Sequence, residues 1–164
     1  MKKLKIYLDT SVISHLDAHD TPERMRETQE FWDVLRENQR YDVCTSSVMN
    51  LELDRCPEPK KTILLRHLAD ISHVSIAETS EIRELADEYA RQGVLSRKHF
   101  NDLRHIAYAV VAGCSIIVSW NFKHFVNVQT FDRVNAVNLI NGYPLVKIVP
   151  PTMLISKGDN DDKL

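Results

Sequence analysis

Hydrophobic positions along the chain change spacing at regular intervals, and the short apolar runs predict strands. The run Ser115–Ser119 is apolar at successive positions, which is typical of a central strand in a parallel sheet that is buried on both faces. The strands expected on this basis are Leu4–Leu8, Tyr41–Thr45, His73–Ile76, Ser115–Ser119 and Leu145–Val149.

Between these runs the apolar residues recur at helical spacing. Pro22 follows the capping residue Thr21 and opens a helix that carries Phe31, Trp32 and Leu35 along one face. The other expected helices follow Ser46 or Ser47, cover Lys60–Leu68, follow Thr79 or Ser80, run from Ser96 or His99 to Ala112, and cover Thr130–Leu139. Because strands and helices alternate, we expect an α/β fold, a three-layer sandwich with a central parallel sheet and helices on both faces.

The length of 164 residues fits one domain, which we place at residues 1–155, before a polar tail at 156–164 that we expect to be disordered. No apolar run approaches the roughly 20 residues that a membrane span requires. Asp9 interrupts the apolar start of the chain, so no signal-peptide core is expected and we predict a cytoplasmic protein. Cys44, Cys56 and Cys114 match neither a disulfide framework nor a zinc pattern, and Cys44 and Cys114 are expected in the core.

Carboxylates occur near the predicted carboxyl ends of strands, where ligands bind in open parallel sheets. Asp9 directly follows the first strand, Glu52 lies in the helix after the second, and Asp102 lies in the helix that leads into Ser115–Ser119. Each has an alternative explanation: Asp9 as a helix N-cap, Glu52 as a solvated acid, and Asp102 as a first-turn acid that favours the helix dipole.

Taken together, the three acids predict a metal site, because carboxylates at one sheet edge repel one another unless a cation lies between them. Oxygen ligands suit Mg²⁺ or Mn²⁺, and such a site activates water for phosphodiester hydrolysis. With only four glycines the chain has no glycine-rich phosphate loop, and no G-x-S-x-G, C-x-x-C or H-E-x-x-H motif occurs.

Several neighbouring residues have two possible roles. Ser11 and Ser119 are expected either to support Asp9 or its water, or only to cap a helix and end a strand. His105, one turn after Asp102, either touches phosphate or is a packed or surface histidine. Trp120 either stacks on a base or packs in the core.

The net charge of −2 and the isoelectric point near 6.4 provide no general attraction to nucleic acid. RNA binding would therefore depend on metal ions or on a local positive rim. The basic residues that flank Asp102 and Asn121 could form this rim or be ordinary solvated charges: Arg97, Lys98, Arg104, Lys123 and His124.

At these positions the sequence resembles the PIN-domain family, which includes the VapC-type toxins of bacterial toxin–antitoxin pairs. The similar segments are residues 6–13 (IYLDTSVI), 46–53 (SSVMNLEL), 102–109 (DLRHIAYA), 118–125 (VSWNFKHF) and 146–154 (VKIVPPTML). Their order and spacing agree with the family over residues 4 to about 154.

The resemblance implies a Mg²⁺- or Mn²⁺-dependent ribonuclease with Asp9, Glu52 and Asp102 as catalytic and metal-binding residues. It also implies a homodimer and an antitoxin partner, with Ser11, Ser119 and Asn121 in supporting positions. Many relatives have an acid where this chain has Asn121, so the expected site holds three formal negative charges instead of four.

Two other function classes remain open at this stage. A PIN-like RNA-binding or protein-interaction module with little or no catalysis is favoured by Asn121 and the acidic isoelectric point, and disfavoured by the three retained acids. A phosphatase with Asp9 as its covalent nucleophile would usually have a second Asp two residues later, where this chain has Ser11.

Overall fold

The computed structural model describes residues 2–37, 40–121 and 127–155. Within them the chain forms a five-stranded sheet, all parallel, in the order β3-β2-β1-β4-β5. The strands are β1 Leu4–Leu8, β2 Tyr41–Ser46, β3 Val74–Ile76, β4 Ile116–Val118 and β5 Lys147–Val149. All five expected strands are therefore confirmed, although β3, β4 and β5 are shorter than predicted and β2 extends one residue further, to Ser46.

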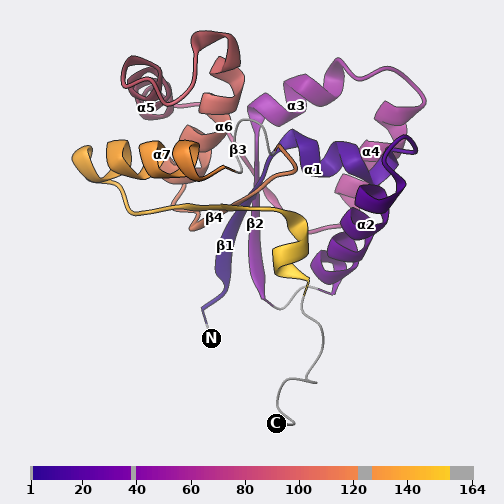
Figure 1. The fold of residues 1–164 in the computed structure, drawn as a ribbon. Coiled ribbons are helices and arrows are strands. Elements are labelled where there is room, and N and C mark those ends of the chain that lie inside the picture. The colour runs from indigo at the N-terminus through magenta and orange to yellow at the C-terminus, as the bar shows by residue number, and fades with distance from the viewer. Residues whose placement is uncertain (1, 38–39, 122–126, 156–164) are drawn as a thin grey trace.

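Helices cover both faces of this sheet, as Figure 1 shows, with α1 to α4 on one side and α5 to α7 on the other. Their bounds are α1 Thr10–Ser14, α2 Pro22–Arg36, α3 Ser47–Asp54, α4 Lys60–Ala69, α5 Ser80–Arg91, α6 Phe100–Val111 and α7 Val128–Ile140. The expected α/β class, with a parallel sheet between two helical layers, is confirmed. Within the described ranges, no helix is long and apolar enough to cross a membrane.

The alternation of side chains along β1 explains why the sheet has two separate cores. Ile6 and Leu8 pack with Phe31 and Trp32 of α2, whereas Tyr7 points to the opposite face and packs against α6. Fully burying one such side chain contributes about 1.5–3 kcal/mol, so both helical layers are held firmly to the sheet.

Helix α3 crosses the end of the sheet and contributes to both cores. Val48 packs on the side of α5 to α7, while Met49 and Leu53 pack on the side of α1 to α4. Leu51 of the same helix is 53% exposed. The short helix turns this side of its surface away from both cores.

The central strands end side by side at one edge of the sheet. Leu8 of β1 pairs with Val118 of β4, and the Asp9 amide donates to the Val118 carbonyl at 3.2 Å. Gly113, with φ of +80°, ends α6 and lets the chain turn into β4. This topology brings the residue after β1 next to the residue after β4, Ser119.

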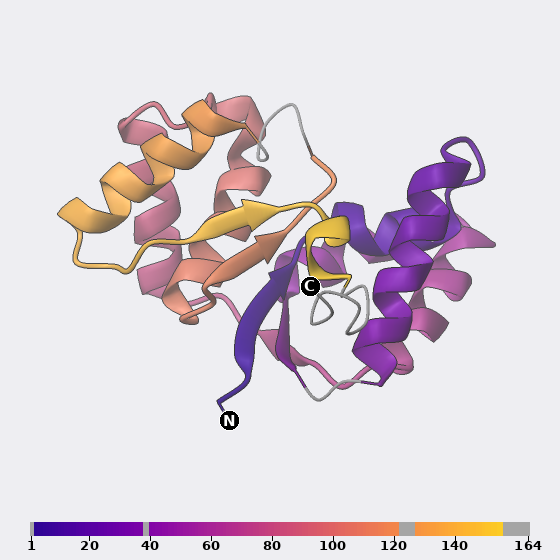
Figure 2. The ribbon, with the colours of Figure 1, turned by 60° about the horizontal axis from the view of Figure 1, so that its bottom comes forward.

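After β5 the chain ends its described part in a short 3₁₀ turn, Pro151–Leu154, which lies beside α2 (Figure 2). Its buried residue Leu154 joins the core under α2. The tail expected at 156–164 lies outside the described residues.

Candidate active site

Asp9 is a buried carboxylate at the carboxyl edge of the sheet, only 4% exposed. It is the N-cap of α1, where its Oδ1 accepts from the Ser11 amide at 3.0 Å and from the Ser11 hydroxyl at 2.5 Å. Its Oδ2 accepts from the Ser119 hydroxyl at 2.8 Å. Asp9 is therefore both the N-cap of α1 and a carboxylate that is hydrogen-bonded by Ser11 and Ser119.

Burial raises the pKa of the Asp9 carboxyl, because a charged carboxylate loses its hydration there. The charge of His105 and the hydrogen bonds from Ser11 and Ser119 act in the opposite direction but do not outweigh the burial. Keeping this position ionised therefore costs the folded protein free energy, which is unusual for a residue whose only role is to cap a helix of five residues.

Glu52 lies in α3, which begins after β2 because Ser46 caps it: the Ser46 hydroxyl accepts from the Met49 amide at 3.2 Å. The Glu52 Oε1 contacts His105 Nε2 at 2.6 Å and accepts from the Thr10 hydroxyl at 3.2 Å. Partial burial raises the pKa of this carboxyl, but the hydrogen bond and charge of His105, with Thr10 and Arg104, lower it below its usual value. Glu52 is therefore stabilised as an anion.

His105 is buried and joins Glu52 to the end of the sheet. On its other side the imidazole Nδ1 lies 2.5 Å from the Tyr7 hydroxyl of β1. The Tyr7 hydroxyl in turn donates to the Ser46 hydroxyl at 2.7 Å. The packed-histidine alternative is therefore correct, and the side chain contacts an acid of the candidate site.

Asp102 lies in the first turn of α6, as the helix-dipole interpretation requires. Its Oδ2 is 3.8 Å from the Nδ1 of His99. In the described ranges, no group of three or more His, Cys, Asp or Glu side chains is placed to hold a metal ion. The expected three-acid arrangement is therefore not a closed metal cluster in this structure.

The donor chemistry still fits a hard cation. Asp9 Oδ2 and Glu52 Oε1 are held by hydroxyl and imidazole groups, and among the described contacts all hydrogen bonds to Glu52 are made by its Oε1. Mg²⁺ commonly takes only one or two carboxylates and completes its shell with water and substrate phosphate. The residues present fit an open, hydrated site better than a closed protein cage.

The expected positive rim is only partly visible. Arg104 bonds Glu78 Oε1 and Asn101 Oδ1, each at 3.2 Å, and its charge helps to lower the pKa of Glu52. A guanidinium nitrogen of Arg97 lies 3.8 Å from Asp87 Oδ1. Lys123 and His124 lie outside the described residues, and Lys98 is exposed. Arg104 is thus the member of the predicted rim that acts on the candidate site.

Trp120 packs in the core, so the packing alternative is correct. Its ring nitrogen donates to the Thr28 hydroxyl of α2 at 2.8 Å, and its amide donates to the Ser11 hydroxyl at 2.9 Å. The Arg24 guanidinium lies 5.3 Å from the centre of its ring. The backbone N–H of Asn121 donates to Ser119 Oγ at 2.9 Å, so the segment after β4 is bonded to the same serines that hold Asp9.

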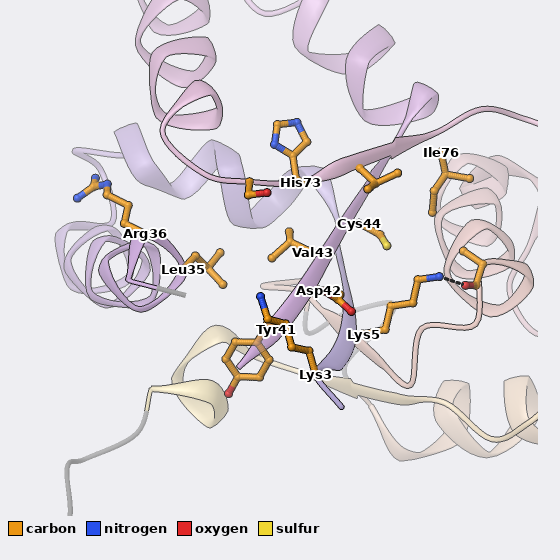
Figure 3. Close-up of a pocket in the computed structure, with 13 residues that line it drawn as sticks. Lys3, Lys5, Leu35, Arg36, Tyr41, Asp42, Val43, Cys44, His73 and Ile76 are labelled. Carbon is orange, nitrogen blue, oxygen red and sulfur yellow. Dashed lines mark hydrogen bonds between the residues drawn. The ribbon is translucent and has the colours of Figure 1, made fainter. Parts of the chain in front are cut away.

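A separate hollow of about 440 Å³ opens at the opposite edge of the sheet, where the strands begin (Figure 3). It lies beside the start of β2, between the end of α2 and the residues that lead into β3, and the Lys, Arg and Asp side chains that line it are Lys3, Lys5, Arg36 and Asp42. The Lys5 ammonium in it is already bonded to the Ala112 carbonyl at 2.5 Å. None of the three candidate acids lines this hollow, so we do not assign the acid-based chemistry to it.

Three residues at this site were not predicted as site residues from the sequence: Thr10 bonds Glu52, Tyr7 contacts His105, and Ser46 bonds Tyr7. Tyr7 is the one side chain with a polar atom in the apolar run Ile6–Leu8, and a buried tyrosine hydroxyl usually requires a partner. That signal indicates a polar partner but does not identify it.

No family model matches the sequence, and no curated protein matches it. Among twelve solved chains that the fold matches is one from the crystal structure of VapBC2 from Rickettsia felis bound to a DNA fragment from their promoter. That match has a TM-score of 0.58 and 15% sequence identity, and covers 90% of this chain and 98% of the other. At this identity the likeness concerns the fold, and it supports the PIN-like α/β architecture expected from the sequence.

Proposed function

We propose that this protein is a metal-dependent endoribonuclease that hydrolyses RNA phosphodiester bonds, with Asp9, Glu52 and Asp102 as its catalytic acids. The observation that carries the proposal is the pair formed by Asp9 and Glu52. One is a buried carboxylate held by two serines, and the other is an anion held by an imidazole, at the same edge of a PIN-like sheet.

The chain's own residues prepare a site for a cation and a phosphate. Ser11 and Ser119 fix the Asp9 carboxylate, so its orientation is set before any ligand arrives. Thr10 and His105 hold one oxygen of Glu52 and leave the other for a ligand. Asp102, in the first turn of α6, adds a partly exposed carboxylate.

A bound Mg²⁺ or Mn²⁺ would neutralise these charges, lower the pKa of a bound water and stabilise the charge that develops on the phosphate. Burial raises the pKa of Asp9, so the site gains from a cation that favours the ionised carboxylate. Arg104 is the described rim residue best placed to favour an anionic substrate.

We further propose that the protein acts as the toxin of a toxin–antitoxin pair, with an antitoxin protein as partner and a homodimer as its own assembly. The fold likeness to a chain of VapBC2 supports this proposal. A PIN-like interaction module without catalysis is the second candidate, favoured by Asn121 and by the lack of a three-ligand cluster among the described side chains.

Single variants Asp9→Asn, Glu52→Gln and Asp102→Asn test the proposal in an RNA-cleavage assay with Mn²⁺. Each should reduce activity by more than the roughly 10–100-fold that follows from removing an outer partner of a metal ligand. Asp54→Asn is a matched control, because Asp54 ends the same helix as Glu52, is exposed and pairs only loosely with Lys61 at 3.7 Å. Full activity in Asp102→Asn would remove that residue from the site.

Binding of the cation is tested separately by thermal melting. A ligand of the folded state alone raises its stability by about 2.7 kcal/mol at 100 times its dissociation constant. Mn²⁺ should therefore raise the melting temperature of the wild type, and the triple amide variant should lose this increase. An equal increase in both proteins would place the metal elsewhere and leave the interaction module as the better proposal.

A further inference from the structure

His105 occupies an unusual place for a titratable side chain. It lies on α6, three residues after Asp102, is 3% exposed, and contacts residues of β1, α1 and α3. Because so little of it reaches the surface, it cannot contact an RNA chain directly. Any effect that it has on the reaction must pass through the groups that it touches.

We propose that His105 is a positioning residue of the proposed ribonuclease, which holds the Glu52 carboxylate in its working orientation. The inference rests on the proposed function for the role of Glu52, and on the contacts of His105 for the rest. This role explains why a polar side chain, His105, lies at the junction of α3, α6 and β1, where an apolar residue could fill the core equally well.

The Nε2 side of the ring makes the contact with the acid. Nε2 lies 2.6 Å from Glu52 Oε1, and the Thr10 hydroxyl reaches the same oxygen at 3.2 Å. A carboxylate can only accept, so Nε2 carries a proton and donates it to Glu52. The two donors fix Oε1, which restricts rotation of the carboxylate and leaves Oε2 for a ligand.

The Nδ1 side fixes the ring itself. The Tyr7 hydroxyl lies 2.5 Å from Nδ1 and 2.7 Å from the Ser46 hydroxyl, and the Tyr7 and His105 rings meet edge to face with centres 5.8 Å apart. Tyr7 belongs to the central strand and Ser46 caps the helix that carries Glu52. The imidazole is therefore fixed between the sheet and α3. In known metal sites, outer hydrogen-bond partners orient the metal-binding side chains in the same way.

The test uses His105→Leu, which keeps an apolar side chain in the core but removes both ring nitrogens, and His105→Gln, which keeps an N–H donor. In His105→Leu we expect kcat to fall by about 10–100-fold while KM for RNA stays unchanged. His105→Gln should recover most of that loss. Tyr108→Phe is the matched control, because it removes another hydrogen bond of α6, between the hydroxyls of Tyr108 and Ser47 at 2.6 Å.

A second readout does not depend on activity. Melting temperatures of wild type, His105→Leu, Glu52→Gln and the double variant, all in chelator, form a double-mutant cycle. If the two side chains act on each other, the shifts of the single variants should not add, with a discrepancy of about 2–4 °C for a coupling of about 1 kcal/mol.

Unchanged kcat in His105→Leu, or additive shifts in the cycle, would overturn the proposal. A loss of kcat in Tyr108→Phe equal to that in His105→Leu would also overturn it, since general weakening of α6 would then explain both. A wild type that cleaves no RNA would refute the proposed function instead. In that case the double-mutant cycle still tests whether His105 and Glu52 interact: non-additive shifts support the interaction and additive shifts overturn it.

Discussion

Neutralising Glu52 should destabilise the metal-free protein, whereas neutralising Asp9 should leave its stability unchanged or raise it. If the acids only repelled one another, an amide at either position would relieve that repulsion and raise the melting temperature. The structure gives the two carboxylates different surroundings. Glu52 is held as an anion by His105, whereas Asp9 is ionised against the cost of its burial.

The expected destabilisation by Glu52→Gln follows from the contact of Glu52 with His105. A hydrogen bond to a charged group contributes about 1.5–3 kcal/mol, and the side chain of Glu52 is 33% exposed, so solvent reduces this value. We expect about 1 kcal/mol of destabilisation, which lowers the melting temperature by about 2–4 °C in a protein of this size. Asp9→Asn should leave the melting temperature unchanged or raise it, because the amide removes the cost of ionising a buried carboxyl. Each tenfold change in the proton affinity of a carboxyl corresponds to about 1.4 kcal/mol.

The pH dependence of the melting temperature tests independently whether each carboxylate stabilises or destabilises the fold. The pKa of Glu52 is lowered on folding, so its stabilisation is present above the unfolded value of about 4.5 and is lost as the pH falls through the folded pKa. The pKa of Asp9 is raised on folding, so its cost is present at neutral pH and disappears as the pH falls through the folded pKa toward the unfolded value near 3.8. Both variants should therefore approach the wild type in acid.

Thermal melts in chelator, at about pH 7 and about pH 3.5, measure these effects. Asp54→Asn again serves as the control, with a shift near zero expected for an exposed acid. A melting temperature of Glu52→Gln equal to or above that of the wild type at pH 7 would refute the conclusion that the His105 contact outweighs the repulsion.

Two more predictions concern the edge of the site. Asn121→Asp should lower the dissociation constant for Mn²⁺, by about tenfold for a gain of about 1.4 kcal/mol, if its side chain faces the cation; equal titrations of both proteins would exclude Asn121 from the site. Substituting Arg104 and Lys123 together with Ala should weaken RNA binding and flatten its salt dependence, by about 0.7 in slope for each phosphate that is no longer neutralised. An unchanged slope would make both residues ordinary surface charges.

The sequence by itself determined the secondary structure and the positions of the candidate acids along it. Periodicity and capping are local properties, so the helix after Thr21 and the strand at Leu4–Leu8 were predictable from a few neighbouring residues. Asp9 was placed at a strand end for the same reason. The bounds of β5 were predicted too long, because the apolar residues Leu145 and Val146 precede the residues that pair with β4.

Only the tertiary structure decided which of these residues meet. The order β3-β2-β1-β4-β5 places Ser119 on Asp9, although the two are 110 positions apart in sequence. It also brings His105 to Tyr7 and Glu52, where the sequence left phosphate contact and simple packing as alternatives. The pKa shifts of Asp9 and Glu52 differ in direction for the same reason: they depend on burial and on partners supplied by distant segments, which no local pattern encodes.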